Sequence, residues 1–137
     1  MTAARRVFVP ALAAGCLALA AASLPPPVRA AGEGGGSEQV RRGRAVFAAA
    51  CSACHGETGR GGVGYANPIW GDGARIAKYK HAGALFEYNQ LLMPFDDPTR
   101  VGDEAKWAVT AYILAEHGAL PRDGTLGPDN AASVVIP

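Results

Sequence analysis

The residues with the clearest capacity for chemistry are two cysteines and a histidine in the run Cys51-Ser52-Ala53-Cys54-His55. Two thiols separated by two residues at the end of a helix can add to the two vinyl groups on one edge of a haem, and the next residue presents an imidazole to the iron. This run is the attachment signature of c-type haem. We therefore expect one covalent haem c on Cys51 and Cys54, with His55 as an axial iron ligand.

Two other kinds of site use closely spaced cysteines. A structural zinc site would need two further Cys or His ligands, and the candidates His81 and His117 are isolated in the sequence. A thioredoxin-like redox pair would lie in a βαβ unit, and no such pattern is present here. Both kinds of site are disfavoured, and we expect His81 and His117 to be surface or structural residues.

A second axial iron ligand is predicted at Met93. Apart from the initiator it is the only methionine of the chain, and it stands directly before Pro94. A thioether is a soft, neutral ligand that raises the reduction potential of haem iron, as suits an electron carrier. The alternative is that Met93 is an ordinary core side chain.

Three segments of helical periodicity must position these ligands. The first begins at the potential N-cap Ser37 and runs to residue 50, with Val40, Gly43 and Phe47 on one face. Because glycine weakens a helix, its presence at position 43 indicates that a neighbouring backbone passes close by.

The second predicted helix covers residues 82–92, with Leu85, Tyr88 and Leu92 on one side, and Pro94 prevents its continuation. The third covers residues 103–117, starts with two acidic residues and ends before a glycine. Its expected inner face comprises Trp107, Ala111 and Leu114. The glycine-rich stretch between residues 55 and 72 predicts a long loop, and residues 121–137 are expected to form an irregular C-terminal tail, either a partner-binding arm or a disordered segment.

Residues 1–30 have the pattern of a secretory signal peptide. Two arginines precede the apolar stretch 7–24, and small or apolar residues stand at the positions that favour cleavage after Ala30. We expect a periplasmic protein that begins with a flexible lead-in, residues 31–36. The alternatives are retention of the apolar stretch as a membrane anchor facing the periplasm, and lipoprotein processing at Cys16.

The charge balance excludes one class of function. Removal of residues 1–30 takes away three of the thirteen basic residues and none of the twelve acidic ones, which leaves a net charge of 10 − 12 = −2. No basic stripe remains, so a nucleic-acid partner is not expected. A domain of this size also buries a modest core, so a bound prosthetic group would matter for its stability.

With these features in view, residues 37–120 resemble the class I cytochrome c family. The resemblance rests on the first helix, the CSACH run, the loop with Pro68, the pair Met93-Pro94 and the last helix with Trp107 and Tyr112. It implies an all-α cytochrome c fold of about three or four helices around one covalently bound haem. In that fold the first and last helices cross, and Gly43 would lie at the crossing.

The resemblance also implies roles for residues around the haem. Pro68 looks like the loop proline whose carbonyl accepts the second N–H of the proximal imidazole, unless it is only a turn former after Asn67. An apolar wall around the porphyrin is implied for the following side chains: Ile69, Trp70, Leu85, Leu92, Phe95 and Tyr112.

Residues 67–71, 93–98 and 107–114 look like parts of the cytochrome subunits of periplasmic sulfite and thiosulfate oxidising systems. With both axial positions filled, we expect a one-electron carrier between a donor and an acceptor protein, with no catalytic residue. The first alternative is a cytochrome subunit or domain of a catalytic sulfite or thiosulfate dehydrogenase. The second is a haem-based gas sensor, which would need an open coordination position.

Overall fold

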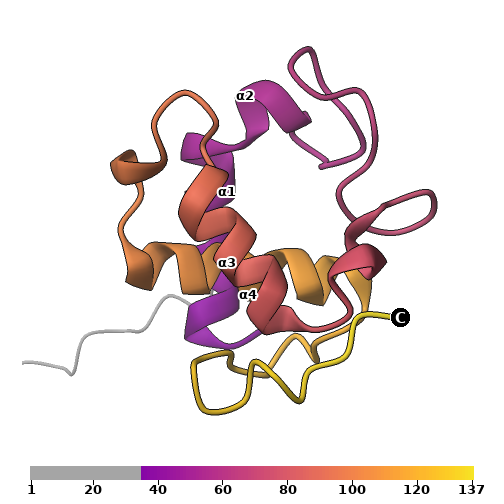
Figure 1. Cartoon of the computed structure of the whole chain (residues 1–137), viewed down its shortest axis with the longest axis vertical. Helices are drawn as coiled ribbons and strands as arrows, with labels where there is room; N and C mark the ends of the chain where they lie inside the picture. The colour runs from indigo at the N-terminus through magenta and orange to yellow at the C-terminus, as the bar shows by residue number, and fades with distance from the viewer. Residues whose placement is uncertain (1–34) are drawn as a thin grey trace, which may run out of the picture. The chain divides into compact units, whose positions relative to one another are not determined.

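The computed structural model of the chain describes residues 35–137. This part contains α1 (Glu38–Ala50), α2 (Ser52–His55), the 3-10 helix η1 (Ile76–Tyr79), α3 (Ala82–Leu92), the 3-10 helix η2 (Pro98–Arg100) and α4 (Asp103–His117) (Figure 1). Its only strand-like pairing is an isolated bridge between His81 and Val135. The all-α fold predicted from the sequence is therefore confirmed. The predicted signal peptide, and the lead-in up to residue 34, lie outside the described residues.

Local sequence signals explain where the three long helices begin and end. The Ser37 hydroxyl accepts a hydrogen bond from the Val40 N–H (3.1 Å) and caps α1. Gly118 ends α4 in the left-handed conformation, which glycine adopts without strain. The bounds of α1, α3 and α4 agree with the three predicted helices. None of the helices in the described part is long and apolar enough to cross a bilayer.

The central packing contact is the crossing of α1 and α4 (Figure 1). Gly43 is buried at this crossing, and a Cβ atom there would overlap the Ala108 carbonyl and lie 2.8 Å from the Tyr112 Cβ. Val40 and Phe47 are buried on the same face of α1. The expected close backbone approach at Gly43 is thus confirmed, and its cause is the passage of α4.

The buried face of α3 includes the predicted Leu85, which is 3% exposed, but it is rotated toward Phe86 and Asn89 relative to the predicted side. Phe86 stacks on Trp107, with ring centroids 3.5 Å apart and planes within 4°. Asn89 is also buried, and its amide donates a hydrogen bond to the Thr110 hydroxyl (3.0 Å). Leu92 is 47% exposed instead. The rotation arises because the partners offered by α4, and not the apolar pattern of α3 alone, decide which side of α3 is buried.

Residues 121–137 are irregular and pack onto the helices. Gln39 of α1 exchanges two hydrogen bonds with the backbone of Leu126, both 2.7 Å long. The N–H of Ile136 donates to the carbonyl of Lys80 (2.9 Å), and the Ile136 side chain is 4% exposed. This segment therefore differs from the expected free arm or disordered tail, because its apolar side chains complete the core.

The same C-terminal segment also caps α3. The first N–H groups of a helix have no partner within the helix. Here the N–H of Ala82 donates to the Val134 carbonyl (2.9 Å), and the N–H of Gly83 donates to the Ala131 carbonyl (3.1 Å). The start of α3 is thus stabilised by residues about fifty positions later in the chain.

We predict that Gly43→Ala destabilises the protein although alanine favours helices by about 1 kcal/mol over glycine. The added methyl group would force α1 and α4 apart, at a net cost of about 1–3 kcal/mol, typical of overpacked cores. Denaturant unfolding followed by circular dichroism measures this loss. The matched control is Gly127→Ala, where an added Cβ meets no atom within 4 Å. Equal stabilities of the two variants would contradict the prediction.

Candidate functional site

The cysteine pair lies where α1 gives way to α2. Cys51 is the C-terminal cap of α1, and its N–H donates to the Phe47 carbonyl (2.9 Å). Cys51 is half-buried, Cys54 is exposed, and both are free thiols. Burial raises the pKa of the Cys51 thiol to about 11, so this group is protonated at neutral pH. The junction of α1 and α2 thus presents two free thiols.

His55 is the last residue of α2 and lies partly buried beside the loop. Burial lowers the pKa of His55, which favours the neutral imidazole, the form that binds metals. Its ring packs edge-on against Tyr65, with centroids 5.3 Å apart. Among the described residues, its Nδ1 is a buried nitrogen without a hydrogen-bond partner. A polar atom buried in this way needs a partner that these side chains do not provide.

The hydrogen bond predicted between the His55 ring and the Pro68 carbonyl is not formed in the structure. Pro68 is half-buried in the glycine-rich loop. That loop is closed by its own backbone, since the Gly61 N–H donates to the His55 carbonyl (3.2 Å) and the Ile69 N–H donates to the Gly59 carbonyl (2.9 Å). These internal bonds, and not a contact with the imidazole, set the path of the loop.

Met93 is positioned by the end of α3. It is the C-terminal cap of that helix, and its N–H donates to the Asn89 carbonyl (3.1 Å). Met93 and Pro94 are half-buried, whereas Phe95 is 86% exposed. Two thiols, a neutral imidazole and a thioether are the donor types that hold a c-type haem, so the residues present fit this group.

The structure divides the predicted apolar wall into two sets. Trp70, Leu85 and Tyr112 are buried, and Ile69 packs against the same core. Leu92 and Phe95 are exposed, so the structure does not bring them together with the others. Trp70 and Tyr112 pack edge-on at 5.6 Å.

Phe47 of α1 completes an aromatic cluster with Trp70 and Tyr112, at centroid distances of 5.0 Å and 5.8 Å. A Cβ on Gly59 would overlap the Trp70 ring, so the loop backbone covers the indole. The cluster therefore links α1, the glycine-rich loop and α4. Helical periodicity placed Phe47 on a buried face, and the family resemblance named Tyr112 and Trp70 for the apolar wall, but neither indicated the contact of these three rings with one another.

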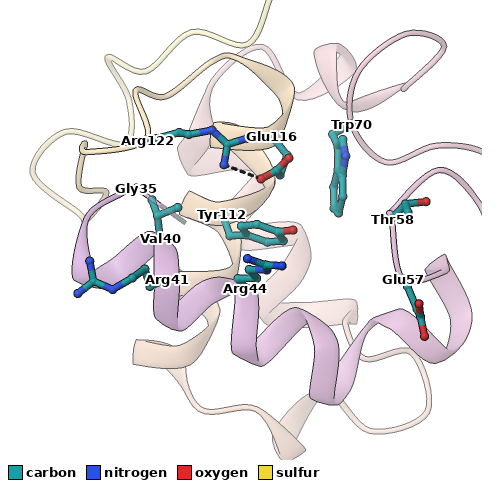
Figure 2. A pocket seen from close by; sticks show the side chains of 10 residues that line it. All are labelled: Gly35, Val40, Arg41, Arg44, Glu57, Thr58, Trp70, Tyr112, Glu116 and Arg122. Carbon is teal, nitrogen blue, oxygen red and sulfur yellow. Dashed lines mark hydrogen bonds and ion pairs between the residues drawn. The ribbon is translucent and has the colours of Figure 1, made fainter. Parts of the chain in front are cut away.

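A pocket of about 500 Å³ lies beside this aromatic cluster (Figure 2). Trp70 and Tyr112 form its apolar part, and Arg44 lies close to Tyr112. Arg122 and Glu116 form an ion pair at its rim (2.9 Å). Cys51, Cys54, His55 and Met93 do not line it. The sequence alone gives no indication of this pocket, because its residues come from distant parts of the chain.

The two remaining histidines have structural roles, as the sequence indicated. The Nδ1 atom of His81 accepts a hydrogen bond from the Ala84 N–H (3.3 Å) and caps α3. The Nδ1 atom of His117 accepts one from the Gly71 N–H (3.0 Å). This second bond attaches the end of α4 to the glycine-rich loop that follows His55.

Comparisons with known proteins identify the family of the chain. A family model described as "Cytochrome C oxidase, cbb3-type, subunit III" matches residues 38–113. Among solved structures, the chain is similar to the sulfane dehydrogenase SoxCD from Paracoccus pantotrophus, with 26% identity and a TM-score of 0.61 over 74% of this chain and 54% of that chain. It is also similar to the thiosulfate dehydrogenase TsdBA from Marichromatium purpuratum, with 26% identity and a TM-score of 0.47 over 80% of this chain and 27% of that chain.

No curated protein matches the chain. The chain spans about half of the SoxCD chain and about a quarter of the TsdBA chain that it matches.

We predict that Trp70→Ala lowers the stability of the protein by about 3–5 kcal/mol, the usual cost of removing a large buried aromatic side chain. The loss follows from the contacts of Trp70 with Phe47 and Tyr112 and from its cover by the loop at Gly59. Denaturant unfolding measures it. Leu91→Ala is the control, because Leu91 is 62% exposed. A loss no greater than that of the control would show that the aromatic cluster does not support the fold.

Proposed function

Because the chain belongs to the cytochrome c family matched by the cbb3-type subunit III model, we propose that it is a mono-haem electron carrier of the periplasm. It accepts one electron from a donor protein and passes it to an acceptor protein. Its cofactor, haem c, supplies the Fe(III)/Fe(II) couple when bound. The observation that carries the proposal is the pairing of an attachment site at the end of α1 with a half-buried methionine at the end of α3.

The proposal assigns a role to each donor. Cys51 and Cys54 hold the porphyrin through thioether bonds, and His55 is the proximal iron ligand. The neutral state of the His55 ring, favoured by burial, supports this role because a protonated imidazole cannot coordinate iron. Met93 is the second axial ligand, and its thioether favours the ferrous state. With both axial positions filled, the site suits electron transfer without bond chemistry on a substrate.

The residues of the predicted apolar wall divide into two groups, those that contact the porphyrin and those that support the contacting residues. We infer that Ile69, Leu92 and Phe95 contact the porphyrin, because burial of their exposed surface under an apolar macrocycle is favourable by about 25 cal/mol per Å². The other three side chains of the predicted wall are buried in the protein core, and we infer that they support the residues that contact the porphyrin: Trp70, Leu85 and Tyr112. Pro68 belongs to the loop beside His55, and its carbonyl remains a candidate acceptor for the imidazole in the haem-loaded protein.

A second function is favoured by the likeness to SoxCD, which is a sulfane dehydrogenase. On this alternative, the chain is the cytochrome subunit or domain of a dehydrogenase that oxidises a sulfur compound. The dehydrogenase would then be the electron donor, and the chain would still carry electrons and not catalyse. Export by residues 1–30 places either version in the periplasm, in solution after cleavage or anchored to the membrane if the segment is retained.

We predict that the oxidised wild-type protein shows the weak sulfur-to-iron absorption band, and that Met93→Leu lacks it. Leucine keeps the apolar volume of methionine but has no ligand atom, so the reduced variant should bind carbon monoxide promptly. Visible spectroscopy with carbon monoxide addition measures both effects. Leu91→Ala, two residues before the cap of α3, is the control and should keep the band, because Leu91 is 62% exposed. Prompt carbon monoxide binding by the wild-type protein would contradict His/Met ligation and favour the sensor alternative.

We also predict that the purified protein, once reduced, is reoxidised by a chemical one-electron acceptor but does not turn over sulfite or thiosulfate by itself. The reason is that filled axial positions leave no site where a substrate could bind iron. Stopped-flow absorbance and an assay of substrate consumption measure the two properties. Turnover by the isolated chain would show that it is an enzyme. Reduction by sulfite only in the presence of a dehydrogenase would support the subunit alternative.

A further inference from the structure

We propose that Lys106 is a positioning residue that holds the Met93 segment against α4 and so keeps the thioether on the haem iron. The inference rests on the proposed role of Met93 as an axial ligand. It adds a residue that lies outside every site predicted from the sequence.

The geometry of Lys106 is unusual for a lysine. Lys106 is only 3% exposed. Its ammonium donates hydrogen bonds to the carbonyl of Gln90 (2.7 Å) and to the carbonyl of Pro98 (2.6 Å). Gln90 lies in the last turn of α3, and Pro98 is the first residue of η2. The two acceptors therefore stand on either side of Met93, and one ammonium group joins the two ends of the segment that carries it.

Burial of this ammonium needs a specific cause. A buried charge is unfavourable unless hydrogen bonds compensate the loss of water. Lys106 also lies about one turn from the N-terminus of α4, where the helix dipole disfavours a cation. The other two lysines of the chain, Lys78 and Lys80, are exposed. A methionine or leucine would fill the same volume without these costs, so the role of the side chain lies in its two backbone acceptors.

The neighbouring contacts show that Lys106 acts on the loop end of the segment. The end of α3 is also attached to α4 by the Asn89–Thr110 hydrogen bond (3.0 Å) and by the amide of Gln90, which donates to Asp103 (3.1 Å). The other hydrogen bonds and ion pairs of residues 94–100 are local, for example the ion pair between Asp96 and Arg100. Among the described residues, the bond from Lys106 to Pro98 is therefore the side-chain hydrogen bond that attaches this loop to α4.

Loss of the Lys106 ammonium should make the Met93 thioether dissociate from the iron more often. Without the ammonium, the end of α3 remains attached to α4 through Asn89 and Gln90. The loop beyond Met93 loses its side-chain hydrogen bond to α4 and keeps only its packing on α3 and its continuation along the chain into α4. A thioether is a weak ligand, so added freedom of its backbone competes directly with the sulfur–iron bond. External ligands that need the vacated position should then bind more readily.

The test uses the haem-loaded protein, with Lys106→Met as the variant and Lys80→Met as the matched control. Imidazole is titrated into the oxidised proteins, and the sulfur-to-iron band and the unfolding midpoint are recorded. We expect Lys106→Met to bind imidazole about tenfold more tightly than the wild type, equivalent to about 1.4 kcal/mol, and to show a weaker band. Lys80→Met should match the wild type in all three measurements.

The outcomes separate the two proposals. A wild-type protein without the sulfur-to-iron band would overturn the role of Met93 and, with it, this inference. A normal band in the wild type, together with unchanged imidazole affinity in Lys106→Met, would overturn the positioning role alone. A lower unfolding midpoint with unchanged band and affinity would show that Lys106 is merely structural.

If Lys106→Met does not fold, Lys106→Gln is measured in the same way. Its amide can donate to one of the two carbonyls, so we expect imidazole affinity between those of the wild type and Met93→Leu. Wild-type affinity in this variant would also overturn the proposal.

Discussion

At Gly43, α1 approaches α4 so closely that a single methyl group would overlap the backbone of α4. The C-terminal end of α1 carries Cys51, and α2 with His55 follows directly. The opposite partner, α4, holds the end of α3 and therefore Met93. The crossing of α1 and α4 thus connects the two segments that carry the proposed iron ligands, although these segments are far apart in the sequence.

The two contacts of α4 differ in chemistry. Its contact with α1 has an apolar and aromatic centre, with Phe47 and Tyr112 beside the buried Gly43, and an exposed ion pair between Arg42 and Glu104. Its contact with α3 contains the Phe86–Trp107 stack and also the buried polar residues of the described part, which are Asn89, Lys106 and Thr110. Close packing at the first contact leaves no room for an added methyl group, and buried hydrogen bonds at the second specify one arrangement. The hydrogen-bonded contact lies next to the proposed ligand Met93.

The helix bounds and the haem attachment run could be predicted from the sequence, because the signals for both are local. A capping serine, a proline after Met93 and a glycine after His117 mark helix ends, and the CSACH run defines an attachment site without any tertiary information. The buried face of α3 could not be predicted, because it depends on the partners that Trp107 and Thr110 offer. Nor could the role of Lys106, since a lysine in the first turns of a helix normally indicates a solvated face.

The C-terminal segment places a constraint on the order of events during biogenesis. The carbonyls of Ala131 and Val134 satisfy the first N–H groups of α3, and Ile136 is 4% exposed in the core. These residues follow α3 by about fifty positions, so they emerge from the ribosome after it and, for an exported chain, cross the membrane after it. The helix that presents Met93 is therefore completed only after the chain is delivered as far as residue 136. The thiols of Cys51 and Cys54 emerge earlier, so the haem can be attached to a chain that has yet to fold.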